Sequence, residues 1–403
     1  MSNIIQIIVT GDNRAEHIDL VMQTLSLHEV SILDITQSVV YESLTLALLL
    51  EIPDGRQETV LKEVLYEAHK QNLHIEFCSI SAEEYEGWLR IRRSKRYIIT
   101  VLGPTLSARH IAGITELVNR WGLQIYFTQR LSSRHSLFTE SGTSPTCFEL
   151  DLRGPTVDLA WLRKEFLTLS QHYGIDIAIQ EDTPYRRHRR LIAFDMDSTL
   201  IQFEVIDELA KRAGVSEEVC RITERAMNGE LDFRQSLARR VALLKGLPRE
   251  ELERVARDMP LTEGARRLIQ NLKILGYKVA IISGGFTFFG RRLQEELGID
   301  YVFANELEIE QDQLTGRVKG EVIDGKKKAD LLRQLAEEES ISLEQVIAVG
   351  DGANDLPMLN LAGLGIAFRA KPMVKEGAKQ TLSNVSLDCV LYFLGMRDYE
   401  AIV

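Results

Sequence analysis

Apolar residues in the first part of the chain occur in short blocks that alternate with amphipathic stretches. Residues 4–10 (IIQIIVT) are mostly apolar, which is typical of a buried strand, whereas the spacing of apolar residues over 15–27 predicts a helix. The same patterns predict strands at 30–36 and 42–52, a helix at 57–71 and a strand at 73–79. The predicted order is strand, helix, strand, strand, helix, strand.

This order repeats further along the chain. A strand at 97–102 (YIITVL) is followed by a helix near 107–121, strands near 123–131 and 146–152, a helix near 156–173 and a strand near 175–180. Both series place a glycine directly after the first strand, at Gly11 and Gly103. We therefore expect two tandem copies of one small α+β fold, at 1–86 and 95–184.

The repeated arrangement resembles the ACT domain, a ferredoxin-like module that commonly binds amino acids at its strand-to-helix loop or at a paired interface. The resemblance implies a regulatory amino acid, with serine as the first choice, and a homodimer. The two loops read Gly11-Asp12-Asn13-Arg14-Ala15 and Gly103-Pro104-Thr105, and neither carries the Asp-Arg-Pro-Gly of the family. The alternative is a dimerisation or packing module without a ligand, because a fold alone does not specify a site.

From residue 191 onward, short apolar strands alternate with helical stretches. The strands are expected at 191–195, 278–283, 301–303, 346–350 and 364–368, which predicts a Rossmann-like parallel α/β sheet in a domain spanning 191–403. An insert at about 203–262 is helical throughout and follows the first strand. Open α/β sheets bind ligands at the carboxyl ends of their strands, so we expect this insert to form a cap over a site.

Composition and net charge argue against some classes of function. The 403 residues are 45% hydrophobic, enough for two or three globular domains, and the net charge of −11 argues against a nucleic-acid or anionic-membrane binder. We interpret the basic segment 185–190 (YRRHRR) as a solvated linker, with a nucleic-acid patch as the alternative. The chain has no apolar run of about 18 residues and no basic n-region at Met1, which predicts a cytoplasmic protein.

Two carboxylates stand at the end of the strand 191–195. Asp195 and Asp197 are two residues apart, so on an extended chain they point to the same side and can address one phosphorus atom and one divalent cation together. An aspartate attacks phosphorus effectively only where a metal and cationic donors offset the negative charge. The other strand ends must therefore supply metal ligands and cationic hydrogen-bond donors.

Three further polar clusters follow the predicted strands. Ser283-Gly284-Gly285 offers a hydroxyl and backbone N–H groups to an anion, and Lys328 begins a helix as a cation, with Lys326 and Lys327 as neighbours. Gly350-Asp351-Gly352-Ala353-Asn354-Asp355 ends another strand in carboxylates suited to Mg²⁺. One parallel sheet would gather all of these groups at a single edge.

This set of motifs resembles the haloacid dehalogenase superfamily and, within it, the phosphoserine phosphatase family, over residues 191 to about 395. The resemblance implies hydrolysis of O-phospho-L-serine, the last step of serine biosynthesis, with Asp195 as nucleophile and Asp197 as general acid and base. It implies Mg²⁺ bound by Asp195, the backbone carbonyl of Asp197 and Asp351, with Asp355 in support. The implied phosphoryl-binding groups are Ser283, Gly284, Asn354 and, among the three lysines, Lys328.

The cap carries the implied specificity. In the family, a glutamate soon after the first motif receives the substrate ammonium and a cap arginine clamps the carboxylate; Glu204 and Arg240 stand at matching positions, with Arg239 as a second candidate. A zwitterion needs one anionic and one bidentate cationic partner. Met227 and Phe233 would be apolar cap residues between them.

Other mechanisms fit this domain less well. All eight histidines precede residue 191, which excludes a phosphohistidine in the catalytic domain, and Cys220 is followed six positions on by Ala226, which breaks the Cys-x5-Arg pattern. Two alternatives stay open: a phosphatase or phosphotransferase acting on another small phosphomonoester, and an amino-acid-sensing regulator with a vestigial enzyme domain.

Overall fold

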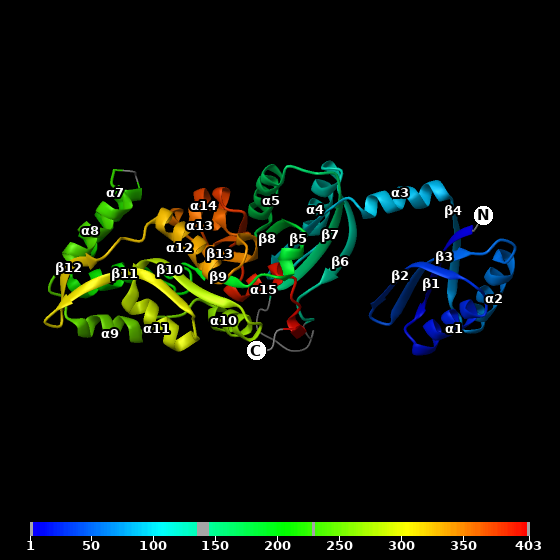
Figure 1. Ribbon diagram of the computed structural model, residues 1–403, viewed down its shortest axis with the longest axis horizontal. Helices are drawn as coiled ribbons and strands as arrows, with labels where there is room; N and C mark the ends of the chain where they lie inside the picture. The colour runs from blue at the N-terminus through cyan, green and yellow to red at the C-terminus, as the bar shows by residue number, and fades with distance from the viewer. Residues whose placement is uncertain (1–2, 135–144, 228–229, 401–403) are drawn as a thin grey trace. The chain divides into compact units, whose positions relative to one another are not determined.

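Residues 3–134, 145–227 and 230–400 are described by the computed structural model, shown in Figure 1. The chain divides into two units, Met1–Ser94 and Lys95–Val403, each with its own hydrophobic core. We therefore describe the two units one after the other.

The first unit is a four-stranded antiparallel sheet covered by helices. It contains β1 (Asn3–Asp12), α1 (Ala15–Ser26), β2 (Ser31–Val40), β3 (Ser43–Ile52), α2 (Gln57–Lys70) and β4 (His74–Ile80), with the strand order β2-β3-β1-β4. Alternate β1 residues, Ile5, Ile7 and Val9, are buried against the two helices. A helix that we did not predict, α3 (Ala82–Arg92), begins with a capping box in which Ser81 and Glu84 satisfy each other's backbone N–H groups.

The second unit begins with the same topology. It contains β5 (Lys95–Gly103), α4 (Ala108–Arg120), β6 (Gln124–Arg130), β7 (Thr146–Gly154), α5 (Leu159–Tyr173) and β8 (Asp176–Glu181), with the strand order β6-β7-β5-β8. Ile114 of α4 and Phe166 of α5 are buried in its core. The predicted ferredoxin-like α+β fold is confirmed, and we call residues 95–181 the second ACT-like repeat.

A seven-stranded sheet follows in the same unit. Its strands are β9 (Leu191–Phe194), β10 (Lys278–Phe286), β11 (Tyr301–Glu310), β12 (Gln313–Lys319), β13 (Val346–Gly350), β14 (Leu364–Phe368) and β15 (Gln380–Leu382), in the order β12-β11-β10-β9-β13-β14-β15. All neighbours pair in parallel except β11 and β12. The predicted parallel α/β sheet is confirmed; β12, an antiparallel edge, and β15, only three residues long, escaped prediction.

Helices cover both faces of this sheet (Figure 1). α10 (Ala265–Ile274) and α11 (Thr287–Leu297) pack with Ile192 and Phe194 of β9, whereas α12 (Gly325–Glu338) and α13 (Leu356–Leu361) pack with Leu191 and Ala193. Because alternate residues of β9 face opposite sides, its four residues are all buried. The ends of β9, β10 and β13 therefore meet at one rigid edge.

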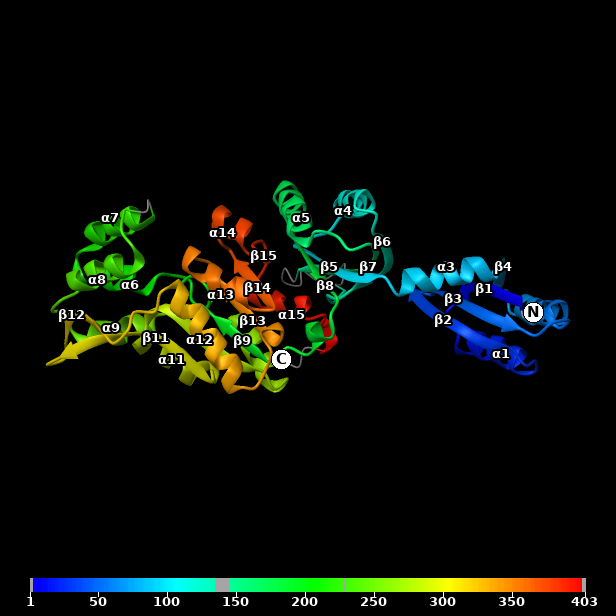
Figure 2. The ribbon, with the colours of Figure 1, turned by 45° about the horizontal axis from the view of Figure 1, so that its top comes forward.

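The segment between β9 and β10 forms α6 (Val205–Ala213), α7 (Ser216–Met227), α8 (Phe233–Leu243) and α9 (Arg249–Arg257). Figures 1 and 2 both show α7 and α8 grouped beside β12, and α8 packs against that strand. Within the described ranges, no helix is both long enough and apolar enough to cross a membrane.

The basic segment 185–190 differs from our interpretation. We expected a solvated linker, but Arg186 is 1% exposed and forms an ion pair with Glu149, and Arg189 is 7% exposed and donates to Gln180. The segment runs along the joint between the second ACT-like repeat and the seven-stranded sheet, so burial at this joint removes these two side chains from water. The joint makes the two domains one unit.

Candidate active site

Asp195 and Asp197 lie in a tight turn at the end of the central strand. The Asp195 N–H donates to the carbonyl of Val349 on β13 (2.8 Å), which extends the ladder by one residue and fixes the start of the turn. The backbone of Ser198 adopts φ +56°, a left-handed conformation uncommon outside glycine. Asp195 and Asp197 are 6% and 8% exposed, so their carboxylates are held in a largely buried place.

Lys328 joins two of the buried carboxylates. Its Nζ lies 2.9 Å from Oδ1 of Asp195 and 2.6 Å from Oδ1 of Asp355, and its side chain has no exposed surface. Burial disfavours the ammonium, but Asp195 and Asp355 outweigh this effect and raise the pKa of Lys328. Lys326 is exposed and Lys327 pairs with Glu321, so the structure brings only Lys328 of the three to this cluster.

Asp195, Asp351 and Asp355 form a carboxylate cluster. One oxygen of each lies within 4.8 Å of the others, and Thr199 Oγ1 donates to Asp351 (3.1 Å). Burial and the neighbouring carboxylates raise the pKa of Asp351 to about 8, and burial with Asp195 raises that of Asp355 to about 6 although Lys328 opposes the shift. The cluster has three carboxylates but, among the described residues, only one neighbouring ammonium, that of Lys328, so its net charge is negative when the carboxylates are ionised. Carboxylate oxygens are the ligands that Mg²⁺ prefers, so the cluster suits a divalent cation of this kind.

The carboxylate of Asp197 is not part of that cluster. One of its oxygens, Oδ1, is buried and has no hydrogen-bond partner in the described part of the chain. Burial, then the charges of Glu204 and Asp195, raise the pKa of Asp197 well above its usual range. The contribution of its backbone carbonyl to a metal site stays a prediction.

Ser283, Gly284 and Gly285 end β10 beside the end of β9. The Gly285 N–H donates to Ser283 Oγ (2.9 Å), which holds this backbone in place. A Cβ on Gly284 would lie 2.8 Å from Phe233, and one on Gly285 would lie 2.8 Å from Oδ2 of Asp197. Only glycine therefore lets the backbone approach both the cap and the carboxylate so closely.

Glu204 and Arg240 face the cluster from the helical insert. Ser198 Oγ donates to Glu204 (2.9 Å), and the Nε of Arg240 is buried without a hydrogen-bond partner among the described residues. Burial lowers the pKa of Arg240, and the carboxylates of Glu204 and Asp207 oppose that shift. Burial raises the pKa of Glu204, although the hydrogen bond from Ser198 opposes the shift and the residue keeps an exposed surface.

These groups surround one cavity of about 110 Å³. The predicted site residues that line it are Asp195, Asp197, Glu204, Arg240, Ser283, Gly284, Asp351 and Asn354. Lys328 lies beneath them, in contact with Asp195. Phe233 lines the cavity and Arg239 does not, while the side chain of Met227 lies outside the described residues.

Sequence reasoning missed part of the site. Thr199, the partner of Asp351, could have been found from its position two residues after Asp197, within the same motif. The apolar wall, made of Ile206, Leu237 and Phe286, carried no such signal, because these residues look like any other apolar positions of helices and strands. Only packing brings them to the cavity.

Family models match two parts of the chain. Residues 192–360 match the haloacid dehalogenase-like hydrolases, and residues 3–78 match the ACT domain. The match to the hydrolases includes the strand ends that carry the cluster, and the match to the ACT domain covers most of the first unit.

Similar proteins cover nearly the whole chain. A phosphoserine phosphatase of Streptomyces coelicolor is 42% identical over 94% of this chain and 88% of its own length, and phosphoserine phosphatase SerB2 of Mycobacterium tuberculosis is 38% identical over 98% and 93%. Among solved structures, a probable phosphoserine phosphatase from Vibrio cholerae in unliganded form matches with a TM-score of 0.59 and 38% identity, over 75% of this chain and 87% of that one.

Proposed function

Because the chain belongs to the phosphoserine phosphatase family of haloacid dehalogenase-like hydrolases, we propose that it hydrolyses O-phospho-L-serine to L-serine and phosphate with Mg²⁺ as cofactor. The observation that carries the proposal is a single cavity lined by Asp195, which Lys328 contacts from beneath, and by Glu204 and Arg240. Asp195 with Lys328 suits a phosphoryl group, and Glu204 with Arg240 suits a zwitterionic amino acid.

Asp195 is the proposed nucleophile. Its carboxylate oxygen attacks phosphorus, the bond from phosphorus to the serine oxygen breaks, and the leaving oxygen takes a proton from Asp197. In the second step water attacks the aspartyl phosphate, Asp197 takes the proton of that water, and phosphate leaves while the Asp195 carboxylate is restored. The buried, unpartnered Oδ1 of Asp197 supports its role in carrying this proton.

Lys328, together with Ser283 and Gly284 near the end of β10, is proposed to bind the phosphoryl group. Lys328 keeps Asp195 oriented through a 2.9 Å contact and offsets the approach of two anions. Ser283, the Gly284 N–H and Asn354 border the same cavity and can donate hydrogen bonds to phosphoryl oxygens. With Lys328 on α12, Ser283 and Gly284 on β10 and Asn354 in the turn after β13, these groups come from three elements, which would fix the orientation of the phosphoryl group before reaction.

Asp195, Asp351 and the backbone carbonyl of Asp197 are the proposed Mg²⁺ ligands, and Asp355 stands close enough to join or orient them. When bound, Mg²⁺ would neutralise the charge that builds on the phosphoryl oxygens. The surplus of carboxylates over ammonium groups in this buried cluster supports the assignment of a divalent cation.

Glu204 and Arg240 are the proposed specificity residues. Arg240 brings a buried guanidinium with an unused Nε, which suits a carboxylate, and Glu204 brings a carboxylate, which suits an ammonium group. The alternative within the same mechanism is another small phosphomonoester, or transfer to an acceptor other than water. Phosphate release from phosphoserine, phosphothreonine and sugar phosphates, compared by kcat/KM, tests the proposal, and a sugar phosphate as the best substrate would reject it.

The biological setting follows from the reaction. We propose that the enzyme performs the last step of serine biosynthesis in the cytoplasm and that the chain forms a homodimer. Serine would bind at the loops containing Gly11 or Gly103, or at a paired interface of the ACT-like repeats. The ACT match over residues 3–78 supports a regulatory amino-acid site. Calorimetry of the full chain with L-serine tests it, and the absence of serine binding would leave the repeats as an assembly module.

A further inference from the structure

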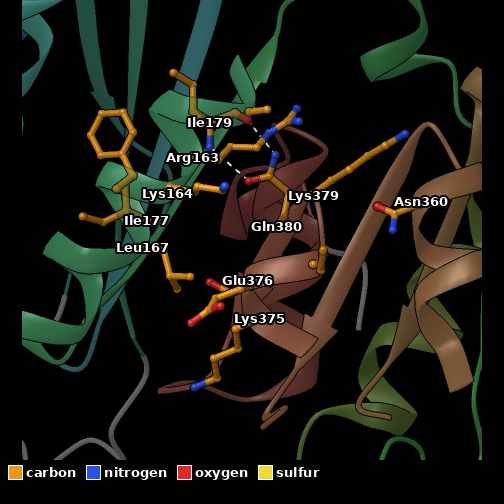
Figure 3. A pocket seen from close by; sticks show the side chains of 15 residues that line it. Arg163, Lys164, Leu167, Ile177, Ile179, Asn360, Lys375, Glu376, Lys379 and Gln380 are labelled. Atoms are coloured by element: carbon orange, nitrogen blue, oxygen red, sulfur yellow. Dashed lines mark hydrogen bonds between the residues drawn. The ribbon is translucent and has the colours of Figure 1, made fainter. Parts of the chain in front are cut away.

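A cationic cavity lies between the second ACT-like repeat and the edge of the seven-stranded sheet. It has a volume of about 240 Å³, and none of the residues that line it lines the catalytic cavity. Its lining includes Arg163 and Lys164 of α5, and Lys375 and Lys379 from the segment of α14 (Pro372–Gly377) and β15, all labelled in Figure 3. Glu376 is the one carboxylate among the residues that line it.

The cations of this cavity are poorly compensated. Arg163 Nε is buried and has no hydrogen-bond partner within the described ranges. Lys379 donates to the carbonyl of Ala362 (2.6 Å), a neutral acceptor. Burial lowers the pKa of Arg163 and of Lys379, and Arg163 lowers that of Lys379 further, while Glu344 opposes this shift. Two partly desolvated cations that repel each other are an unfavourable arrangement unless an anion lies between them.

The walls of the cavity are held firmly. The side chain of Gln380 bonds both the N–H and the carbonyl of Ile179 (3.1 and 2.6 Å), which ties β15 to β8 directly beside the cations. Phe166 and Ile177 are buried beneath it and keep water away from one side. Low local polarity strengthens the attraction between a bound anion and the cations.

We propose that this cavity binds a small anion, a phosphate or a carboxylate, held by Arg163 and Lys379 and bridging the second ACT-like repeat to the phosphatase domain. The guanidinium supplies a planar fork that matches either oxyanion, and the ammonium supplies a point charge from the opposite wall. The proposal is independent of the substrate of the catalytic cavity, because none of its residues lines that cavity.

Calorimetry on the full chain tests the proposal. Inorganic phosphate and acetate, a carboxylate without an amino group, are titrated separately, with EDTA present, into wild type, the double variant R163Q/K379Q, and the control R120Q, which changes an exposed cation on α4 of the same repeat. We expect one of the probes to bind wild type and the control with equal affinity, and the double variant about 10- to 150-fold more weakly. Equal affinity in the double variant, or no binding of either probe to wild type at about 10 mM, would overturn the proposal.

Thermal unfolding separates loss of an anion site from a simple folding defect. If Arg163 is part of an anion-binding site, that site is empty in anion-free buffer and its cation is uncompensated. Removing the cation in R163Q should then raise the unfolding temperature above that of wild type. The bound probe should raise the unfolding temperature of wild type but not of R163Q. A fall in the unfolding temperature of R163Q that is equal with and without the probe would mean that Arg163 acts only in packing, and the proposal would be wrong.

Discussion

At the residue scale, the candidate active site combines several buried carboxylates with one buried ammonium group. Asp195, Asp351 and Asp355 lie together, and the ammonium of Lys328 contacts Asp195 and Asp355. Burial and neighbouring carboxylates raise the pKa of Asp351 and Asp355, and, against the effect of burial, the two carboxylates in contact with Lys328 raise its pKa. Asp197 stands apart from the cluster with a free oxygen. The different surroundings of the two aspartates at the end of β9 fit different chemical roles.

Asp195→Asn should abolish turnover while leaving the fold intact, because an amide neither attacks phosphorus nor binds Mg²⁺ well. Steady-state kinetics with phosphoserine measure the loss, and beryllofluoride should form an adduct with wild type but not with the variant. Asp330→Asn, at an exposed position, is the matched control and should keep wild-type activity. Activity of more than a few per cent in Asp195→Asn would remove this residue from the nucleophilic role.

Lys328→Met should lower both activity and stability. Its removal leaves buried carboxylates without their cation, a change that costs about 3–5 kcal/mol of unfolding free energy. Urea denaturation in the presence of a chelator measures this loss. Lys326→Met, on the same turn of α12 but exposed, should stay within about 0.5 kcal/mol of wild type. Equal effects of the two substitutions would show that Lys328 does not hold the cluster together.

At the scale of elements, the proposed phosphoryl-binding residues lie at the sheet edge and the proposed specificity residues lie on the helical insert. The strand ends carry Asp195, Ser283 and Asp351, whereas Glu204 precedes α6 and Arg240 lies on α8. α8 also packs against β12, so its position depends on the antiparallel edge of the sheet. Recognition of the substrate can therefore change without change at the phosphoryl site.

Arg240→Ala should weaken transition-state binding of phosphoserine by about 2–5 kcal/mol and affect p-nitrophenyl phosphate far less, because that compound has no carboxylate to clamp. Glu204→Gln should behave likewise through the ammonium group. Arg239→Ala, the neighbouring exposed position on α8, is the control. The measurement is kcat/KM for both substrates in each variant, and equal losses on both would assign Glu204 and Arg240 to cap structure alone.

At the scale of the whole molecule, the two ACT-like repeats differ in how they join the enzyme. The first lies within the unit Met1–Ser94, whereas the second belongs to the unit that holds the seven-stranded sheet. Asp176 of β8 is 1% exposed and accepts the N–H groups of Ser383 and Asn384 (2.8 and 2.7 Å). The second repeat is therefore part of the structural support of the phosphatase domain.

A chain that starts at Lys95 should keep the unfolding temperature of the phosphatase domain. A chain that starts at Arg189 should unfold about 5 °C or more below it, because backbone groups now bonded to Asp176 and the side chain of Gln380 lose their partners. Differential scanning calorimetry of both truncated chains and of the full chain measures the difference. Equal unfolding temperatures for the two truncated chains would show that the joint contributes no stability.

Local patterns were enough to predict most of the elements and the residues at the strand ends. The apolar runs before Asp195, Ser283 and Asp351 predicted parallel strands, and parallel strands bring their carboxyl ends to one edge whatever their distance in sequence. The structure does bring these residues to one cavity. Helix α3 was missed although Ser81 and Glu84 carried a capping signal, because its residues are too exposed to give a strong apolar pattern.

The sequence by itself determined the fold class, the two-repeat arrangement and the set of polar residues at the sheet edge, because strand and helix periodicity and motif spacing are local properties of the chain. The family resemblance favoured Lys328 and Arg240, but local pattern left their neighbours open, and the tertiary structure shows that Lys328 reaches Asp195 and that Arg240 lines the cavity. Only the tertiary structure revealed that Arg186 and Arg189 are buried. Neighbouring residues of like charge have nearly the same local pattern. Their burial depends on which distant element packs against them, and that is fixed only when the chain folds.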